Sequence, residues 1–180
     1  MCDEEDRKGT AVMGLKAVLA VALALSMPLV LPGAVAAQEA GSFRSLQSYV
    51  QDFTTIEHAG GAYTAGTLIG TSTVLESSGP PFVKGATNIA RCLVFVGTFR
   101  DGVVDLESPC TFTDGTGDEI YLLARRREGD IAEGGGGAGR FEIMGGTGKF
   151  AGISGGCTYV ARYLPANHAD SASKCTWQRP

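Results

Sequence analysis

Two segments of the chain place polar side chains on one face of a predicted strand, at a spacing suited to chemistry. Glu119, Tyr121 and Arg125 alternate along one segment, and Tyr159 and Tyr163 alternate along another. If these faces turn into a barrel, they supply a carboxylate, tyrosine proton donors and a counter-charge that can orient a substrate or stabilise developing charge. If they turn outward, they form an ordinary solvated face. Glu119, Tyr121 and Arg125 are therefore candidate catalytic residues, and Tyr121, Tyr159 and Tyr163 are candidate ligand contacts.

The remaining polar residues form no recognisable catalytic constellation. His58 and His168 each occupy a turn-like setting, and no nucleophile-elbow serine accompanies them. Asp114, Asp118 and Glu119 crowd one turn with oxygens at a spacing that suits calcium, but the full calcium-binding loop is missing and a plain acidic turn explains them better. We expect no metal and no cofactor. The sequence leaves open whether the protein is an enzyme.

The first part of the chain has the features of a secretory signal peptide. Over residues 13–37, Lys16 provides a positive start, an apolar run follows, and small residues then supply a cleavage site. We expect Met13 to be the true start, residues 1–37 to be removed on export, and residues 38–180 to form one domain that is periplasmic or extracellular. Prolines in the apolar run argue against a permanent span, so no stable membrane span is expected after cleavage.

The composition of the exported part argues against nucleic acid as a partner. Removing the leader takes away four of the 19 acidic and three of the 15 basic residues, which leaves a net charge of −3. Phosphate binding needs a clustered basic face. The one basic cluster, residues 125–127, is followed by Glu128 and Asp130 and is typical of a solvated strand end.

Four cysteines, Cys92, Cys110, Cys157 and Cys175, remain after export and predict two disulfides. Four cysteines allow three pairings, but the spacing favours one. Cys92 and Cys110 are 18 residues apart, as are Cys157 and Cys175, and each interval has turn residues at its middle. In a β-hairpin such cysteines lie opposite each other, within disulfide range.

The exported part has almost no helical periodicity and reads as an all-β domain. Glycines fall between β-rich runs, which suits many strands joined by tight turns. The glycine-rich stretch 128–139 predicts a loop. We expect strands at roughly 48–57, 62–76, 86–98, 102–113, 117–127, 138–144, 150–163 and 171–178. This spacing matches a single antiparallel barrel or sandwich.

A glycine run lies between two of these strands and has the sequence Gly145-Gly146-Thr147-Gly148-Lys149-Phe150. A phosphate-binding loop would need a glycine five residues before the Gly-Lys pair and a serine or threonine after the lysine. Position 143 is Ile and position 150 is Phe, so the run does not bind nucleotide in that way. The glycines instead suit a tight turn.

The segment from Phe141 to Gly156, which contains this run, resembles the glycine hairpin of the allene oxide cyclase-like and dirigent-like β-barrel superfamily. The resemblance implies one antiparallel eight-stranded β-barrel whose interior holds a small apolar molecule, and a homo-oligomer as a candidate assembly. Members of the superfamily include cyclases and proteins that steer radical coupling. No catalytic residue of theirs aligns with this chain, so none is carried over.

Two functions follow for the exported barrel. The first is a protein that binds a small hydrophobic ligand or a partner surface, in line with the lack of a catalytic constellation. The second is a cyclase, an isomerase or a dirigent-like guide that holds a small apolar substrate in one conformation, a task that needs few diagnostic residues. An outer-membrane barrel is disfavoured, because the strands lack a sustained lipid-facing apolar alternation.

Overall fold

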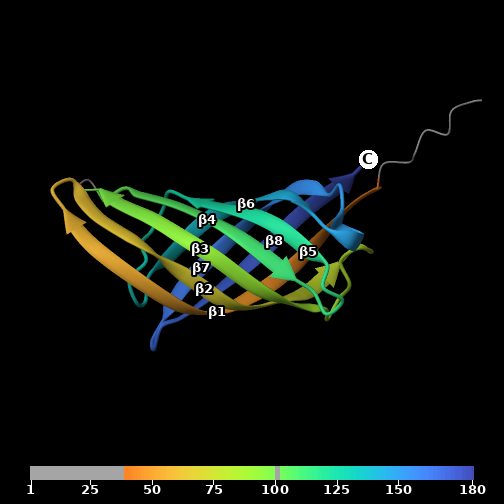
Figure 1. Ribbon diagram of the computed structural model, residues 1–180, viewed down its shortest axis with the longest axis horizontal. Coiled ribbons are helices and arrows are strands. Elements are labelled where there is room, and N and C mark those ends of the chain that lie inside the picture. Colours follow the sequence, from red (N-terminus) through yellow and green to blue (C-terminus); the bar gives the residue numbers. More distant parts are fainter. Residues whose placement is uncertain (1–38, 100–101) are drawn as a thin grey trace, which may run out of the picture. The chain divides into compact units, whose positions relative to one another are not determined.

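The computed structural model describes residues 39–99 and 102–180, which form a closed barrel of eight antiparallel strands (Figure 1). The strands follow one another around the barrel in sequence order, and the last pairs with the first. Their bounds are β1 Glu39–His58, β2 Gly61–Ser77, β3 Thr87–Phe99, β4 Val104–Thr113, β5 Glu119–Arg126, β6 Gly136–Gly146, β7 Ser154–Leu164 and β8 His168–Arg179. The predicted fold class is confirmed.

Some expectations concern residues that the structure does not describe. The predicted signal peptide, residues 1–37, lies outside the described residues. Among the residues that are described, no helix has the length and hydropathy needed to cross a membrane.

Alternation of inward and outward side chains builds the core inside the barrel, most regularly in β3, β5 and β8. In β5 the side chains of Ile120, Leu122 and Ala124 are buried, whereas Tyr121 and Arg125 at alternate positions are exposed. Successive side chains of a strand point to opposite faces, so the apolar set turns inward and the polar set turns to solvent. The two faces that the sequence predicted for this strand are confirmed, and the apolar one lines the interior.

Several strand boundaries differ from the prediction. β7 begins at Ser154 and not at residue 150, because Gly148–Phe150 form a short 3-10 helix, and β8 begins at His168 and not at residue 171. β1 begins at Glu39, well before the predicted start at residue 48, and β6 begins at Gly136 inside the stretch predicted as a loop. Gly137 and Gly139 face inward on β6, where a Cβ on Gly137 would lie 2.8 Å from Nη1 of Arg126 and one on Gly139 would lie 2.4 Å from the Tyr159 ring. These glycines leave room for the large side chains of Arg126 and Tyr159 inside the barrel. Their place in a glycine-rich stretch predicts a loop, so the sequence alone misses this role.

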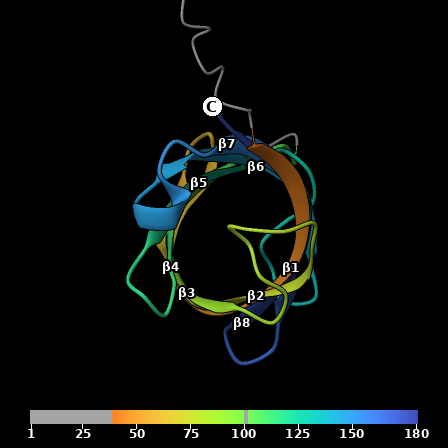
Figure 2. The same cartoon turned by 90° about the vertical axis from the view of Figure 1, so that its right-hand side faces the viewer.

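Loops cover both ends of the barrel. At one end the β2–β3 loop reaches across the opening (Figure 2), and its Phe82 is buried against Phe43, with ring centroids 3.7 Å apart. At the other end the β5–β6 loop, residues 127–135, folds inward so that Ile131 packs against both apolar clusters of the core. The open centre of the ribbon in Figure 2 is therefore occupied by side chains.

Both predicted disulfides are present, Cys92–Cys110 between β3 and β4 and Cys157–Cys175 between β7 and β8. In each hairpin the two cysteines are direct cross-strand partners, with Cα atoms 4.1 Å and 3.9 Å apart. All four cysteines are buried, so the disulfides lie inside the barrel. The pairing favoured by the equal spacing is confirmed.

The glycine run docks the β6–β7 connection onto the neighbouring β4–β5 turn. The N–H of Thr147 donates to the Glu119 carbonyl (2.8 Å), and Oγ1 of Thr147 accepts from the Glu119 N–H (2.9 Å). Gly148 has a φ of +49°, and a Cβ there would meet the Asp118 carboxylate at 1.8 Å, so both the backbone conformation and the space favour glycine. Phe150 ends the short 3-10 helix η1, Gly148–Phe150, and is buried. The run is a structural element.

Asp114, weighed above as a calcium ligand, binds other groups of the protein. Its Oδ1 accepts from the Thr116 N–H (2.7 Å), the Thr116 hydroxyl (2.7 Å) and the Asp118 N–H (3.0 Å), while Oδ2 forms an ion pair with Nζ of Lys149. Burial acts to raise the pKa of Asp114, but the contacts with Lys149 and with the turn outweigh it and hold the pKa well below its usual range. No cluster of three or more metal-binding side chains occurs among residues 39–99 and 102–180.

Asp114→Asn is expected to lower the free energy of unfolding by about 1–2 kcal/mol at neutral pH, because the amide loses the charge that Lys149 and the turn donors bind. A carboxyl whose pKa is depressed in the folded state stabilises the protein above the pKa of the unfolded chain, about 3.9, and loses that stabilisation as the pH falls towards the folded value. The difference between wild type and variant should therefore shrink below about pH 4. Urea denaturation at neutral pH and at about pH 3 measures it.

Lys149→Met is the companion variant. The Lys149 side chain is 42% exposed, so losing its ion pair with Asp114 should lower the free energy of unfolding by about 0.5–1 kcal/mol. This is less than the effect expected for Asp114→Asn. A difference between wild type and Asp114→Asn that is as large at about pH 3 as at neutral pH would show that the carboxylate charge does not stabilise this turn.

Candidate functional site

The interior of the barrel contains a small cavity, lined by both apolar and polar residues. Its volume is about 40 Å³, and the Cys92–Cys110 disulfide forms part of its wall. The inward-facing polar side chains of the lining come from five strands, β1, β4, β5, β7 and β8, and are Tyr49, Ser108, Arg126, Tyr159, Tyr163 and Ser171. About 10–15 Å³ suffices for a water molecule, whereas ligand pockets usually measure about 300–1,000 Å³. The cavity in this state holds a few atoms and no complete organic ligand.

Arg126 is the dominant group of the cavity. It ends β5 on the inward face and is only 2% exposed. Nη1 donates to the Glu128 carbonyl (2.7 Å), and Nη2 donates to the Asp130 carbonyl (3.0 Å) and to the Tyr163 hydroxyl (3.3 Å). Nε has no hydrogen-bond partner within the described part of the chain. The guanidinium therefore holds the β5–β6 loop in place and retains one free donor.

No carboxylate among the described residues forms an ion pair with Arg126. Asp170 borders the cavity through its position on β8, but its side chain alternates with the buried Ala169 and Ser171, and its carboxylate accepts two hydrogen bonds from the exposed Arg162 of β7, at 3.0 Å and 2.8 Å. A buried charge without a counter-charge is costly, and its neighbours here are neutral carbonyls and hydroxyls. The cavity thus carries net positive charge.

The tyrosines around Arg126 remain protonated over the physiological range. Burial raises the pKa of Tyr159 to about 12, although the charge of Arg126 acts in the opposite direction. Burial also raises the pKa of Tyr163, which contacts Arg126, and of Tyr49 on β1. These hydroxyls can donate hydrogen bonds to an oxygen placed in the cavity. Together with the guanidinium they form a site rich in donors, suited to an anionic or phenolic oxygen.

The candidate residues of the sequence analysis divide between the two faces of the barrel. Tyr159 and Tyr163 lie inside and contribute to the cavity. Glu119, Tyr121 and Arg125 lie on the outer face, because alternation turns their apolar neighbours inward. The Tyr121 hydroxyl donates to Glu119 there (2.8 Å). The interior placement considered for these three residues is therefore corrected, and they do not line the cavity.

On the outer face of the barrel, Arg125 forms ion pairs with the two neighbouring strands. Its guanidinium pairs with Glu107 on β4 (3.3 Å) and with Glu142 on β6 (3.1 Å), both exposed. These are ordinary cross-strand ion pairs. Arg126, one residue further, was missed because the triple-arginine stretch looked like a solvated strand end. The signal that could have found it is its register, two residues after Ala124 on the apolar face of β5.

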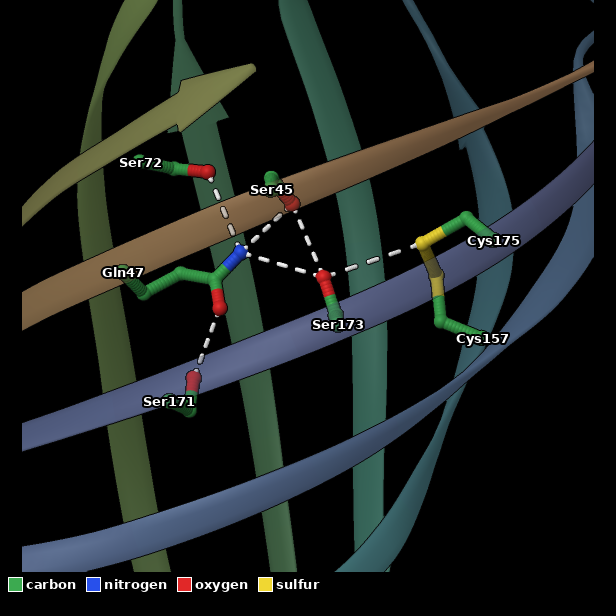
Figure 3. Close-up of a disulfide and its surroundings, with 7 residues drawn as sticks. All are labelled: Ser45, Gln47, Ser72, Cys157, Ser171, Ser173 and Cys175. Carbon is green, nitrogen blue, oxygen red and sulfur yellow. Dashed lines mark hydrogen bonds between the residues drawn. A yellow bond between two sulfur atoms is a disulfide. The ribbon is translucent and has the colours of Figure 1, made fainter. Parts of the chain in front are cut away.

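A second polar cluster fills the barrel beside the Cys157–Cys175 disulfide (Figure 3). Its centre is Gln47, which is 1% exposed. The Gln47 amide nitrogen donates to Ser45 (2.7 Å) and lies 3.3 Å from both Ser72 and Ser173, while its amide oxygen accepts from Ser171 (2.7 Å). A cavity of about 20 Å³ adjoins the cluster. With every polar atom of Gln47 engaged, this cluster offers an incoming ligand less than the Arg126 site does.

Comparison with known proteins gives similarity at the level of the whole barrel. Neither a family model nor a curated protein sequence matches the chain. Among solved structures, the pterocarpan synthase dirigent protein GePTS1 matches at 16% identity, covering 79% of this chain and 91% of that one, with a TM-score of 0.49. A second pterocarpan synthase dirigent protein, PsPTS1, matches at 13% identity, covering 79% and 94%, with a TM-score of 0.44. The chain is structurally similar to dirigent proteins in its barrel fold.

Proposed function

We propose that this protein is an exported barrel that binds a small molecule inside, with an anionic or phenolic oxygen of the ligand against Arg126. The observation that carries the proposal is the buried guanidinium, which lacks a carboxylate partner within the described residues and has a free Nε donor beside a cavity. The two interior disulfides support export into an oxidising compartment, either periplasmic or extracellular.

The rest of the ligand is expected to be apolar. Ile131 of the β5–β6 loop packs against a cluster formed by Val94, Val96, Val104 and Leu106, beside the Arg126 cavity. The loop is tied down by the hydrogen bonds from Arg126 to its carbonyls. An apolar body that replaces Ile131 would occupy this end of the barrel while the ligand oxygen takes over the donors of Arg126. A small apolar molecule with one polar oxygen fits this arrangement.

Native mass spectrometry of protein purified from an oxidising compartment tests the proposal, with sodium benzoate as a defined carboxylate probe in calorimetry. Wild type is expected to carry an extra mass that is lost on denaturation, or to bind benzoate. Arg126→Gln should weaken binding by about 10- to 100-fold, because a charge-assisted hydrogen bond contributes about 1.5–3 kcal/mol.

Arg125→Gln is the matched control, since Arg125 precedes Arg126 and lies on the outer face. It should change benzoate affinity by less than about twofold. Tyr159→Phe is a second test of the site, because it removes one hydrogen-bond donor and keeps the ring packing. It should also weaken benzoate binding, and it remains informative if the Arg126 variant misfolds. A wild type with no bound mass and no affinity for benzoate, or equal binding by both arginine variants, would overturn the proposal.

A catalytic role is the second candidate, and the contact between Arg126 and the tyrosines favours it. A cation next to protonated tyrosines would stabilise an oxyanion that develops on a bound substrate, as in a cyclase, an isomerase or a dirigent-like guide. Once a ligand is known, Tyr159→Phe separates the two roles. A binding protein would lose affinity alone, whereas an enzyme would lose turnover at saturating substrate.

A further inference from the structure

The β1–β2 hairpin extends beyond the strand that flanks it in the barrel. β1 pairs with β8 only as far as Val50, whose partner is His168, and one further bond joins the N–H of Gln51 to the Asn167 carbonyl (2.8 Å). Pairing with β2 continues to His58. Residues 52–58 therefore have a partner strand on one side and none on the other among residues 39–99 and 102–180 (Figure 1).

The direction of the free backbone groups follows from the last bond to the β7–β8 turn. The N–H of Gln51 points away from β2, and backbone groups alternate in direction along a strand. Phe53, Thr55 and Glu57 thus present their N–H and C=O groups to the open side. No hydrogen bond of these backbone groups on that side is found in the described part of the chain. The segment is an unpaired strand edge.

This edge lacks three of the features that usually block pairing, namely proline, lysine and a β-bulge, although it carries the carboxylates of Asp52 and Glu57. Its sequence, Asp-Phe-Thr-Thr-Ile-Glu-His, contains no proline and no lysine, and the register shift of the β1–β2 pair lies far from it, at Arg44 and Ser45. Thr54, Thr55 and Ile56 are β-branched and favour the extended conformation. An unprotected edge of this kind is a template for another strand.

We propose that the edge formed by residues 52–58 pairs with the same edge of a second copy of this chain, antiparallel and with Thr55 on the two-fold axis. In this register Phe53 and Glu57 face each other across the interface, and Thr55 faces the partner's Thr55. The three outward-facing positions then exchange about six hydrogen bonds. If the register between the two strands shifts by one residue in either direction, fewer of these hydrogen bonds can form.

The side chains on the outer face support this register. Asp52 lies opposite the partner's His58, which brings a carboxylate beside an imidazole, and Thr54 lies opposite the partner's Ile56. Ile56 is 65% exposed and its β2 neighbour Tyr63 is 48% exposed. Joining two hairpins into one four-stranded sheet places two such apolar pairs on a common face. The self-complementary order of side chains favours a second copy over an unrelated peptide.

Analytical ultracentrifugation of the exported protein over about 1 µM to 1 mM tests the pairing. Wild type is expected to show a concentration-dependent dimer. Thr55→Pro should raise its dissociation constant at least about thirtyfold, because proline removes the two bonds on the axis and its ring blocks the approach. The N–H of Thr55 points away from β2, so the variant should keep the melting temperature of its matched control, Thr55→Val, which loses the same hydroxyl contact with Thr64.

A cysteine pair tests the register. Thr55→Cys places two cysteines opposite each other across the axis, with Cα atoms about 5.5 Å apart and within disulfide range. Thr54→Cys places them on a diagonal, out of reach. Oxidation should cross-link the first variant and leave the second without an intermolecular disulfide, as non-reducing denaturing electrophoresis would show. A wild type that stays monomeric at every concentration, a dimer insensitive to Thr55→Pro, or equal cross-linking of the two cysteine variants would overturn the proposal.

Discussion

Replacing both cysteines of the Cys157–Cys175 pair with alanine is expected to lower the free energy of unfolding by about 3 kcal/mol. The disulfide closes a loop whose ends are 18 residues apart, and opening it restores the corresponding chain entropy to the unfolded state. Both sulfurs lie inside the barrel, where the Ser173 hydroxyl is 3.9 Å from Sγ of Cys175, so the alanines also leave unfilled space. Urea denaturation of the double variant under oxidising conditions measures the change.

The Cys92–Cys110 pair is a matched control because its ends are also 18 residues apart. If loop closure dominates, the two double variants should be destabilised equally, within about 1 kcal/mol. A loss of less than about 1 kcal/mol for either pair would mean that the disulfide compensates for strain or that the reduced unfolded chain keeps its hairpin. If removing Cys157–Cys175 lowers the free energy of unfolding by more, the additional destabilisation comes from the contact of this disulfide with the Ser173 cluster.

Gln47→Ala is expected to cost about 3–4 kcal/mol, the second large effect. Gln47 joins the first and last strands of the barrel, because its own strand carries Ser45 and its partners Ser171 and Ser173 lie on β8. Alanine would leave the Ser171 hydroxyl without its acceptor and open a cavity at this seam (Figure 3). Thermal or urea unfolding of the variant gives the value.

Gln51→Ala is the matched control for this prediction. Gln51 lies four residues further along the same face of β1, is half-buried, and has a side-chain oxygen without a partner among the described residues. Its replacement should cost less than about 1 kcal/mol. Equal losses at the two positions would show that burial of a glutamine side chain, and not the serine network, accounts for the stability.

Much of the barrel could be predicted from the alternation of residue types. The faces of β5 follow from side chains that alternate between core and solvent, and the two disulfides follow from the equal spacing of the cysteines around a central turn. The same rule failed at the start of β1. There Ser45 and Gln47 face inward while Leu46 faces solvent, so the polarity pattern is the reverse of the usual one. A buried polar network satisfied by residues more than a hundred positions away leaves no local signal.

The candidate site was only partly predictable for a related reason. Tyr159 and Tyr163 were singled out by their alternation and do line the cavity. Arg126 has the right register but the wrong polarity for a core position, and its burial depends on the carbonyls of the β5–β6 loop and on the space left by Gly137. Local sequence shows neither the fold of that loop nor the glycine opposite. The residue most suited to bind a ligand is the one that a polarity rule assigns to solvent.

The closure of β8 on β1 sets an order of events for a chain made from its N-terminus. Arg179 and Glu39 form an ion pair across 140 residues of sequence, and the Gln47 cluster also needs the last strand. Contacts this distant form late, since their loop entropy must be overcome first. Each disulfide, by contrast, closes within one hairpin and needs no other strand. The nascent chain can therefore close the Cys92–Cys110 hairpin early, whereas the Cys157–Cys175 hairpin and the closed barrel both wait for β8, so the first six strands stay an open sheet until then.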